Sequence, residues 1–348
     1  MNLATAQRLL KDDDAERSAL EQALGVDQRN LMALIRLAQL HERLGDVGPA
    51  TQRWSAVLSL ASAIDRPSPE FANILAHARS YVESQRRELA EALDAALASN
   101  LAGASTRDRR RASAARDVML GRRRMFANDC HGLHYPFLPA DEFFDREQFA
   151  WLETLESATG EIRAELEAIL AGRDPGLEPY VAQPTGVPDN KWSPLDRSLD
   201  WGALHLWRDG EPIEENCARA PKTAALVETL PLCRIPGRAP AVFFSILKAG
   251  KHIPPHTGVT NVRSIVHLPL IVPEGCTFRV GGETRPWIEG EAFVFDDTIE
   301  HEAVNPTDHD RAVLILDIWN PYLTDAEREM ICTIYAVTAS LQEPMRAD

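Results

Sequence analysis

Two histidines that are far apart in the sequence lie beside runs of residues typical of strands. His256 closes the segment His-Ile-Pro-Pro-His, and His301 follows the run Phe293–Phe295. Arg311 opens a third such run, which ends at Trp319. Imidazole nitrogens bind Fe(II) in proteins, and a guanidinium group binds a carboxylate through two parallel hydrogen bonds. The pattern therefore predicts an iron site in a jelly roll, with the arginine holding the far carboxylate of a 2-oxo acid.

The strands that position these residues are short apolar runs between turns. Valine, isoleucine, phenylalanine and tryptophan dominate them, which favours a sandwich or barrel of antiparallel strands. Trp201 and Trp207 are an even number of residues apart, so we expect both to pack on one core face of a strand rather than to contact a substrate. The expected strands cover residues 203–208, 241–248, 264–272, 277–280, 291–296 and 311–319.

Residues 15–98 carry apolar side chains at helical spacing and show no strand pattern. Gly45 can end one helix and Asp46 can cap the next, which indicates a helical hairpin of the tetratricopeptide type. A plain helical bundle explains the same spacing. Ser68, which is followed by a proline, predicts the start of another helix that continues to Leu97.

Composition excludes some classes of function. The 348 residues carry a formal net charge of −15, which disfavours general binding to nucleic acids or membrane surfaces. Residues 101–124 contain eight arginines. We interpret them as a solvated connecting helix, with a nucleic-acid patch as the alternative. The five cysteines are scattered, so we expect reduced thiols and no structural zinc. With no long apolar run and no signal-peptide core, we expect a cytoplasmic protein.

Residues from about 134 to 332 resemble the aspartyl/asparaginyl β-hydroxylase family of Fe(II)- and 2-oxoglutarate-dependent oxygenases. The resemblance implies an α+β multidomain chain, in which all-α tetratricopeptide-like helices precede a double-stranded β-helix, or jelly roll. We expect a helical domain at 1–100, an Arg-rich linker helix at 101–130 and a catalytic domain at 131–348. The motifs that carry the resemblance are Tyr135-Pro, Trp201-Gly-Ala-Leu-His-Leu-Trp-Arg-Asp-Gly, Glu215-Asn-Cys-Ala-Arg-Ala-Pro-Lys-Thr, Pro255-His-Thr-Gly and Asp297-Thr-Ile-Glu-His-Glu.

The resemblance implies that His256 and His301 are the iron ligands. Related oxygenases usually have a carboxylate two residues after the first histidine, where this chain has Gly258. The β-hydroxylase family is known for lacking that carboxylate, so Gly258 agrees with the resemblance. Asp296 and Asp297 are the alternatives for a third protein ligand.

The resemblance also implies the residues that hold 2-oxoglutarate. Ser245 and Arg311 match the pair that binds its distal carboxylate, and His267 matches a residue near the carboxylate beside the keto group. Some members have a second basic residue where this chain has Ile265. Arg263 remains, and it faces either the cosubstrate or the substrate.

The reaction implied by the resemblance is hydroxylation of a peptide or protein, at the β carbon of an aspartate or asparagine. The helical region and the jelly-roll cleft are the expected contacts of that partner, with neither nucleic acid nor membrane involved; the oligomeric state stays open. One alternative is hydroxylation of a free amino acid or small carboxylate. The other is a non-catalytic scaffold, in which helices accompany a jelly-roll binding domain.

Overall fold

The computed structural model describes residues 2–342 of the chain. Contacts divide the chain into two compact units, Met1–Arg123 and Arg124–Asp348. Among the described residues, no helix is both long and apolar enough to cross a membrane. All five cysteines have free thiols, as expected from their spacing.

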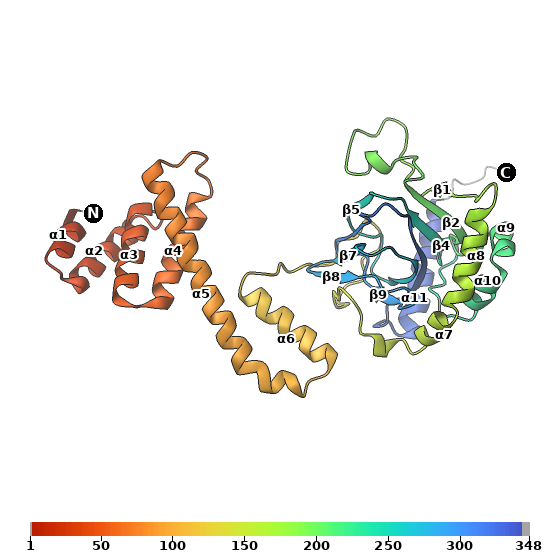
Figure 1. The fold of residues 1–348 in the computed structure, drawn as a ribbon, viewed down its shortest axis with the longest axis horizontal. Coiled ribbons are helices and arrows are strands. Elements are labelled where there is room, and N and C mark those ends of the chain that lie inside the picture. Colours follow the sequence, from red (N-terminus) through yellow and green to blue (C-terminus); the bar gives the residue numbers. More distant parts are fainter. Residues whose placement is uncertain (1, 343–348) are drawn as a thin grey trace. The chain divides into compact units, whose positions relative to one another are not determined.

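The first unit is entirely helical, which fits the tetratricopeptide-like region that the sequence indicates (Figure 1). Gly45 ends α3 with a φ of 75°, the left-handed conformation that glycine adopts most easily. Asp46 occupies the N-cap position of α4 but makes no capping hydrogen bond with its side chain, because its carboxylate contacts His41 Nδ1 at 3.0 Å. The helices are α1 (Asn2–Leu9), α2 (Asp13–Val26), α3 (Leu31–Leu44), α4 (Val47–Ala61), α5 (Pro69–Ala102) and α6 (Thr106–Met119).

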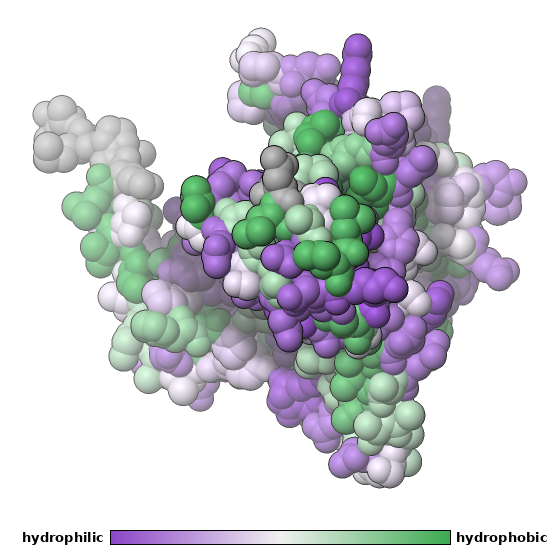
Figure 2. All heavy atoms as spheres, turned by 90° about the vertical axis from the view of Figure 1, so that its left-hand side faces the viewer, coloured by the Kyte–Doolittle hydropathy of each residue, from purple (hydrophilic) through white to green (hydrophobic). Residues whose placement is uncertain are grey.

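The helices of this unit enclose a core centred on Trp54, which is fully buried and donates a hydrogen bond to Glu42 at 2.9 Å. Ser68 caps α5 by accepting a hydrogen bond from Phe71 N–H, so the predicted start of this helix is confirmed. The Arg-rich helix α6 has no buried residue. Figure 2 shows hydrophobic and hydrophilic side chains interleaved on the face that it presents.

Two antiparallel sheets form the centre of the second unit (Figure 1). The larger has the order β1-β2-β4-β11-β6-β9, with β3 paired to β2, and the smaller has the order β5-β10-β7-β8. After β4 the chain passes repeatedly from one sheet to the other, and only the hairpin β7-β8 stays within the smaller sheet. This is the pattern of a double-stranded β-helix, so the predicted jelly roll is confirmed. The strands are β1 (Glu178–Pro179), β2 (Trp201–Arg208), β3 (Glu211–Pro212), β4 (Val242–Leu247), β5 (His252–His256), β6 (Arg263–Ile271), β7 (Thr277–Val280), β8 (Glu283–Pro286), β9 (Phe293–Phe295), β10 (His301–Val304) and β11 (Arg311–Trp319).

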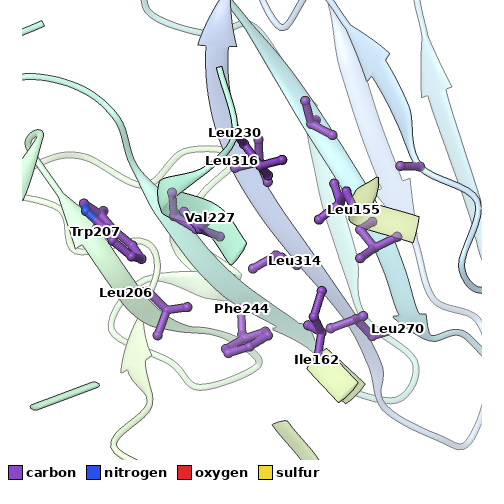
Figure 3. Close-up of a cluster of buried hydrophobic side chains, with 14 of the residues drawn as sticks. Leu155, Ile162, Leu206, Trp207, Val227, Leu230, Phe244, Leu270, Leu314 and Leu316 are labelled. Atoms are coloured by element: carbon purple, nitrogen blue, oxygen red, sulfur yellow. The ribbon is translucent and has the colours of Figure 1, made fainter. Parts of the chain in front are cut away.

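Helices cover the outer face of the larger sheet. Figure 3 shows this outer core, in which Phe244 and Leu314 of the sheet lie near Ile162 of α8 and Val227 of α10. The inner face of the larger sheet packs against the smaller sheet. The helices of this unit are α7 (Leu152–Ser157), α8 (Thr159–Ala171), α9 (Glu214–Arg219), α10 (Pro221–Glu228) and α11 (Asp325–Gln342), with 3-10 turns at Arg146–Gln148 and Ser193–Leu195.

The expectation that Trp201 and Trp207 share one core face is wrong. The register of β2 against β4 shifts between His205 and Trp207, and such a bulge turns the following side chain to the other face. Trp201 therefore lies between the sheets, whereas Trp207 packs in the outer core under the helices (Figure 3).

Candidate active site

The two predicted ligand histidines lie side by side on the smaller sheet. His256 is the last residue of β5 and His301 is the first residue of β10, and the two strands pair them directly across the ladder. Their ring centroids are 4.1 Å apart. Two imidazoles this close, on neighbouring strands, can bind one metal ion together.

Each imidazole is oriented by a backbone carbonyl. His256 Nδ1 lies 2.8 Å from Pro254 O, and His301 Nδ1 lies 3.0 Å from Ile299 O. A carbonyl oxygen can only accept a hydrogen bond, so each Nδ1 carries the ring proton that is donated. Each Nε2 therefore keeps its lone pair for a metal. Burial lowers the pKa of His256 to about 4 and holds the pKa of His301 well below its usual value. Both rings are therefore neutral near pH 7, as metal ligands must be.

A third protein ligand is not in place. Within residues 2–342, no group of three or more histidine, cysteine or acidic side chains is arranged to hold a metal ion. The Asp297 carboxylate instead fills the space beside Gly258, where a Cβ would overlap it. Burial raises the pKa of Asp297 to about 7, and its Oδ1 atom has no hydrogen-bond partner.

The predicted carboxylate-binding pair lies deeper, between the sheets. Arg311 begins β11 and Ser245 pairs with Val313, two residues further along, so both side chains project from the inner face. Arg311 is 2% exposed and Ser245 is fully buried. Trp201 Nε1 donates a hydrogen bond to Ser245 Oγ at 3.0 Å, which leaves the hydroxyl proton of Ser245 free to donate.

Arg311 is a buried cation without a counter-ion. Within residues 2–342 it forms no ion pair, and its Nη2 atom has no hydrogen-bond partner. The guanidinium carbon lies 5.1 Å from the centre of the Trp287 ring. Burial lowers the pKa of Arg311 to about 10, which shows how unfavourable this charge is in its surroundings. An anionic ligand would neutralise the charge of the guanidinium group and accept a hydrogen bond from its unpaired Nη2.

His267 lies on β6, opposite Ile315. Its ring stacks on Trp287, with centroids 5.6 Å apart and planes 9° from parallel. The Nδ1 atom is buried without a hydrogen-bond partner, so it is a second unsatisfied polar group in the same interior.

Arg263 lies at the opposite end of this sheet from Arg311. It begins β6 and pairs with Trp319, the last residue of β11, whereas Arg311 is the first. Along β11, Trp319 is eight residues beyond Arg311, which corresponds to about 26 Å of extended strand. Arg263 Nη1 forms an ion pair with Asp317 at 2.7 Å, and its Nε atom has no partner.

The predicted metal- and cosubstrate-binding residues all line one cavity of 480 Å³. Its wall also includes aromatic side chains that the sequence analysis did not identify. Trp192 lies edge-on to His256, with ring centroids 5.0 Å apart. Tyr180 stacks on Trp201 at 4.0 Å. Tyr180 and Trp192 come from the Gly- and Pro-punctuated region before β2, whose lack of periodicity left no signal for their position.

A segment that we call the strap, residues 128–135, crosses both loops that hold the histidines. At one end Asn128 Nδ2 donates to Asp296 Oδ2 at 2.7 Å and to Thr298 Oγ1 at 2.9 Å, next to the turn that leads into His301. At the other end the Tyr135 backbone exchanges two hydrogen bonds with the Asn261 side chain, in the loop after His256.

The middle of the strap also contacts the loop after His256. Gly132 N–H donates to Val259 O at 2.7 Å, and a Cβ on Gly132 would stand 2.8 Å from the same oxygen. Thr260 Oγ1 donates to Leu133 O at 2.6 Å. The strap therefore ties the loop after His256 to the turn before His301, next to the strands that pair the two histidines.

This combination defines the second unit as a double-stranded β-helix with paired neutral histidines at one end of its cavity and a buried arginine at the other. Residues 156–321 match the family model described as aspartyl/asparaginyl beta-hydroxylase. The second unit is similar to this family over these residues.

The relatives show how far the similarity extends. An aspartyl/asparaginyl beta-hydroxylase of Mus musculus is 41% identical over 147 residues, which are 40% of this chain and 20% of that protein. An ornithine lipid ester-linked acyl 2-hydroxylase of Rhizobium tropici is 36% identical over 197 residues, 56% of this chain and 66% of that protein. The chain thus spans only about a fifth of the mouse relative. A Cupin 2 barrel protein of Salinispora arenicola matches in structure with a TM-score of 0.24 and 12% identity, covering 43% of this chain and 98% of that one.

Proposed function

We propose that the second unit is a hydroxylase that uses Fe(II) and 2-oxoglutarate. The observation that carries this proposal is Arg311, a buried guanidinium with no carboxylate partner among residues 2–342 and with an unsatisfied Nη2. Desolvating a cation is costly unless a ligand compensates it, so the site is built for an anion that enters the cavity.

The residues present fit both groups. His256 and His301 offer two neutral Nε2 donors, a set suited to Fe(II), and with only two protein ligands more coordination positions remain for a chelating 2-oxo acid and for oxygen. Arg311 and Ser245 fit the distal carboxylate as a charged fork and a hydroxyl donor. In this proposal His267, whose buried Nδ1 has no hydrogen-bond partner, binds the carboxylate beside the keto group.

Arg263 belongs to the substrate side in this proposal, because the length of β11 separates it from Arg311. Its partner Asp317 keeps the guanidinium in place while Nε stays available for a hydrogen bond. The proposed substrate is a peptide or protein hydroxylated at the β carbon of an aspartate or asparagine, which the name of the mouse relative supports. The name of the bacterial lipid hydroxylase supports an acyl chain as the second candidate.

The chemistry divides between the bound groups and the chain. When bound, Fe(II) and 2-oxoglutarate supply oxygen activation and C–H oxidation. The backbone carbonyls of Pro254 and Ile299 hold the two imidazoles in the ligating tautomer. The apolar wall around Trp201 excludes water, and it strengthens the pairing of Arg311 with a carboxylate because the local dielectric is low.

The test is succinate formation by the purified chain. With Fe(II), oxygen and 2-oxoglutarate, the protein should release succinate and add one oxygen atom to a peptide, measured by mass spectrometry. Anaerobic titration with Zn(II) in place of iron separates binding from turnover. Failure to bind 2-oxoglutarate under these conditions would leave the non-catalytic jelly-roll interpretation as the better one.

A further inference from the structure

A second cavity adjoins the cavity that contains the histidines. It has a volume of 390 Å³ and lies between the strap, the turn at 235–239 and α11. Val259 and Arg263 line both cavities. The segment that leads away from His256 is therefore the partition between them, and a ligand that crosses this partition would contact both.

The second cavity has an apolar lining with charge at its rim. Ile235 and Ala239 are 2% and 3% exposed, and Ile334 and Tyr335 of α11 line the same cavity. The guanidinium of Arg238, an exposed residue, lies 5.0 Å from the centre of the Tyr335 ring. Such a hollow suits an apolar side chain whose flanking groups stay polar and partly solvated.

Arg263 gives the partition a hydrogen-bond donor. One of its nitrogens is held by Asp317, and the buried Nε has no partner. A backbone carbonyl is the acceptor that a polypeptide would present on crossing from one cavity to the other.

We propose that the second cavity is a subsite for an apolar side chain of a polypeptide substrate, a few residues away from the residue that lies at the two histidines. This inference rests on the proposed function, and it selects a polypeptide over a free amino acid, which is too short to contact both cavities. Such a subsite would make the enzyme selective for the amino-acid sequence around the residue that it modifies.

The experiment uses synthetic peptides with a central asparagine or aspartate in a Gly/Ser background, with one leucine scanned through the flanking positions. We expect leucine at one position to raise kcat/KM about 10-fold or more, the usual effect of filling a hydrophobic subsite. Ile334→Asp should abolish that gain while leaving the affinity for 2-oxoglutarate and the turnover of leucine-free peptides unchanged. Val337→Asp is the matched control, because Val337 is on the same helix, is 53% exposed and does not line the cavity.

The outcomes separate this inference from the proposed function. A leucine gain that survives in Ile334→Asp, the absence of any gain, or free asparagine turned over as efficiently as the peptides would overturn the subsite. No modification of any peptide, with 2-oxoglutarate still bound, would also overturn it and leave the cosubstrate site standing. A wild-type chain that binds no 2-oxoglutarate would refute the proposed function instead.

Discussion

Replacing Arg311 should have opposite effects on ligand binding and on the stability of the ligand-free protein. Truncating one partner of a buried charge pair costs about 2–5 kcal/mol, or roughly 30-fold to several thousand-fold in affinity. Arg311→Met should weaken 2-oxoglutarate binding by this amount and leave metal binding by the histidines nearly intact. Arg311→Lys should recover part of the loss, because it restores the charge without the bidentate fork.

In the absence of 2-oxoglutarate, the same substitution should stabilise the protein. The pKa of Arg311 falls from 12.5 to about 10 on burial, which corresponds to an unfavourable free energy of about 3 kcal/mol for the charged form. Arg311→Met removes this cost and keeps much of the volume, so the free energy of unfolding of the ligand-free protein should rise by about 1–3 kcal/mol. Saturating 2-oxoglutarate should stabilise the wild type, by about 2.7 kcal/mol at 100 times its Kd, and should have little effect on the variant.

Anaerobic titration of 2-oxoglutarate in the presence of Zn(II), followed by thermal unfolding of the same samples, measures both effects. Ser245→Ala is the graded comparison and should weaken binding by only about 1 kcal/mol, because it removes one hydrogen bond. If Arg311→Met binds 2-oxoglutarate as the wild type does, the carboxylate assignment is wrong. If the ligand-free variant is instead much less stable, Arg311 has a structural partner and the argument from its unpaired charge fails.

Other predictions concern the metal site and the outer edge of the sheet. His256→Ala and His301→Ala should each raise the Fe(II) concentration needed for succinate formation more than about 100-fold, measured by iron titration; an unchanged requirement would remove that residue from the site. Gly258→Asp should not improve activity and should lower the unfolding temperature, because its Cβ meets the Asp297 carboxylate; tighter iron binding would contradict this. His205 has a pKa lowered to about 4, chiefly by burial, so the unfolded chain binds more protons between pH 6.5 and 4. As pH falls through this window, the wild type should therefore lose about 1–2 kcal/mol more stability than His205→Gln, as measured by urea unfolding of both proteins.

The sequence predicted the larger sheet better than the smaller one. The expected strands at 203–208, 264–272 and 311–319 agree with β2, β6 and β11 within two residues at each end. These strands are buried on both faces, so their apolar runs are long and continuous.

The strands that carry the two histidines left almost no signal. β5 contains two prolines in five residues, and β10 has only four residues. Proline is uncommon within strands and short runs lack periodicity. The residue pattern therefore suggested a shared site for His256 and His301, but it did not predict that the two residues pair across neighbouring strands. The contact between Gly258 and Asp297 was also out of reach, because it joins two loops through tertiary packing.

The strap has a consequence for how the second unit can be separated from the helices. The sequence suggested a boundary at residue 131, but a fragment that begins there lacks Asn128 and Asp129, which hydrogen-bond the turn before His301. Such a fragment keeps every proposed ligand and loses the hydrogen bonds that tie the strap to the turn before His301. A fragment of the second unit that keeps these hydrogen bonds should therefore start no later than Asn128, and one that starts at Arg124 contains the whole compact unit.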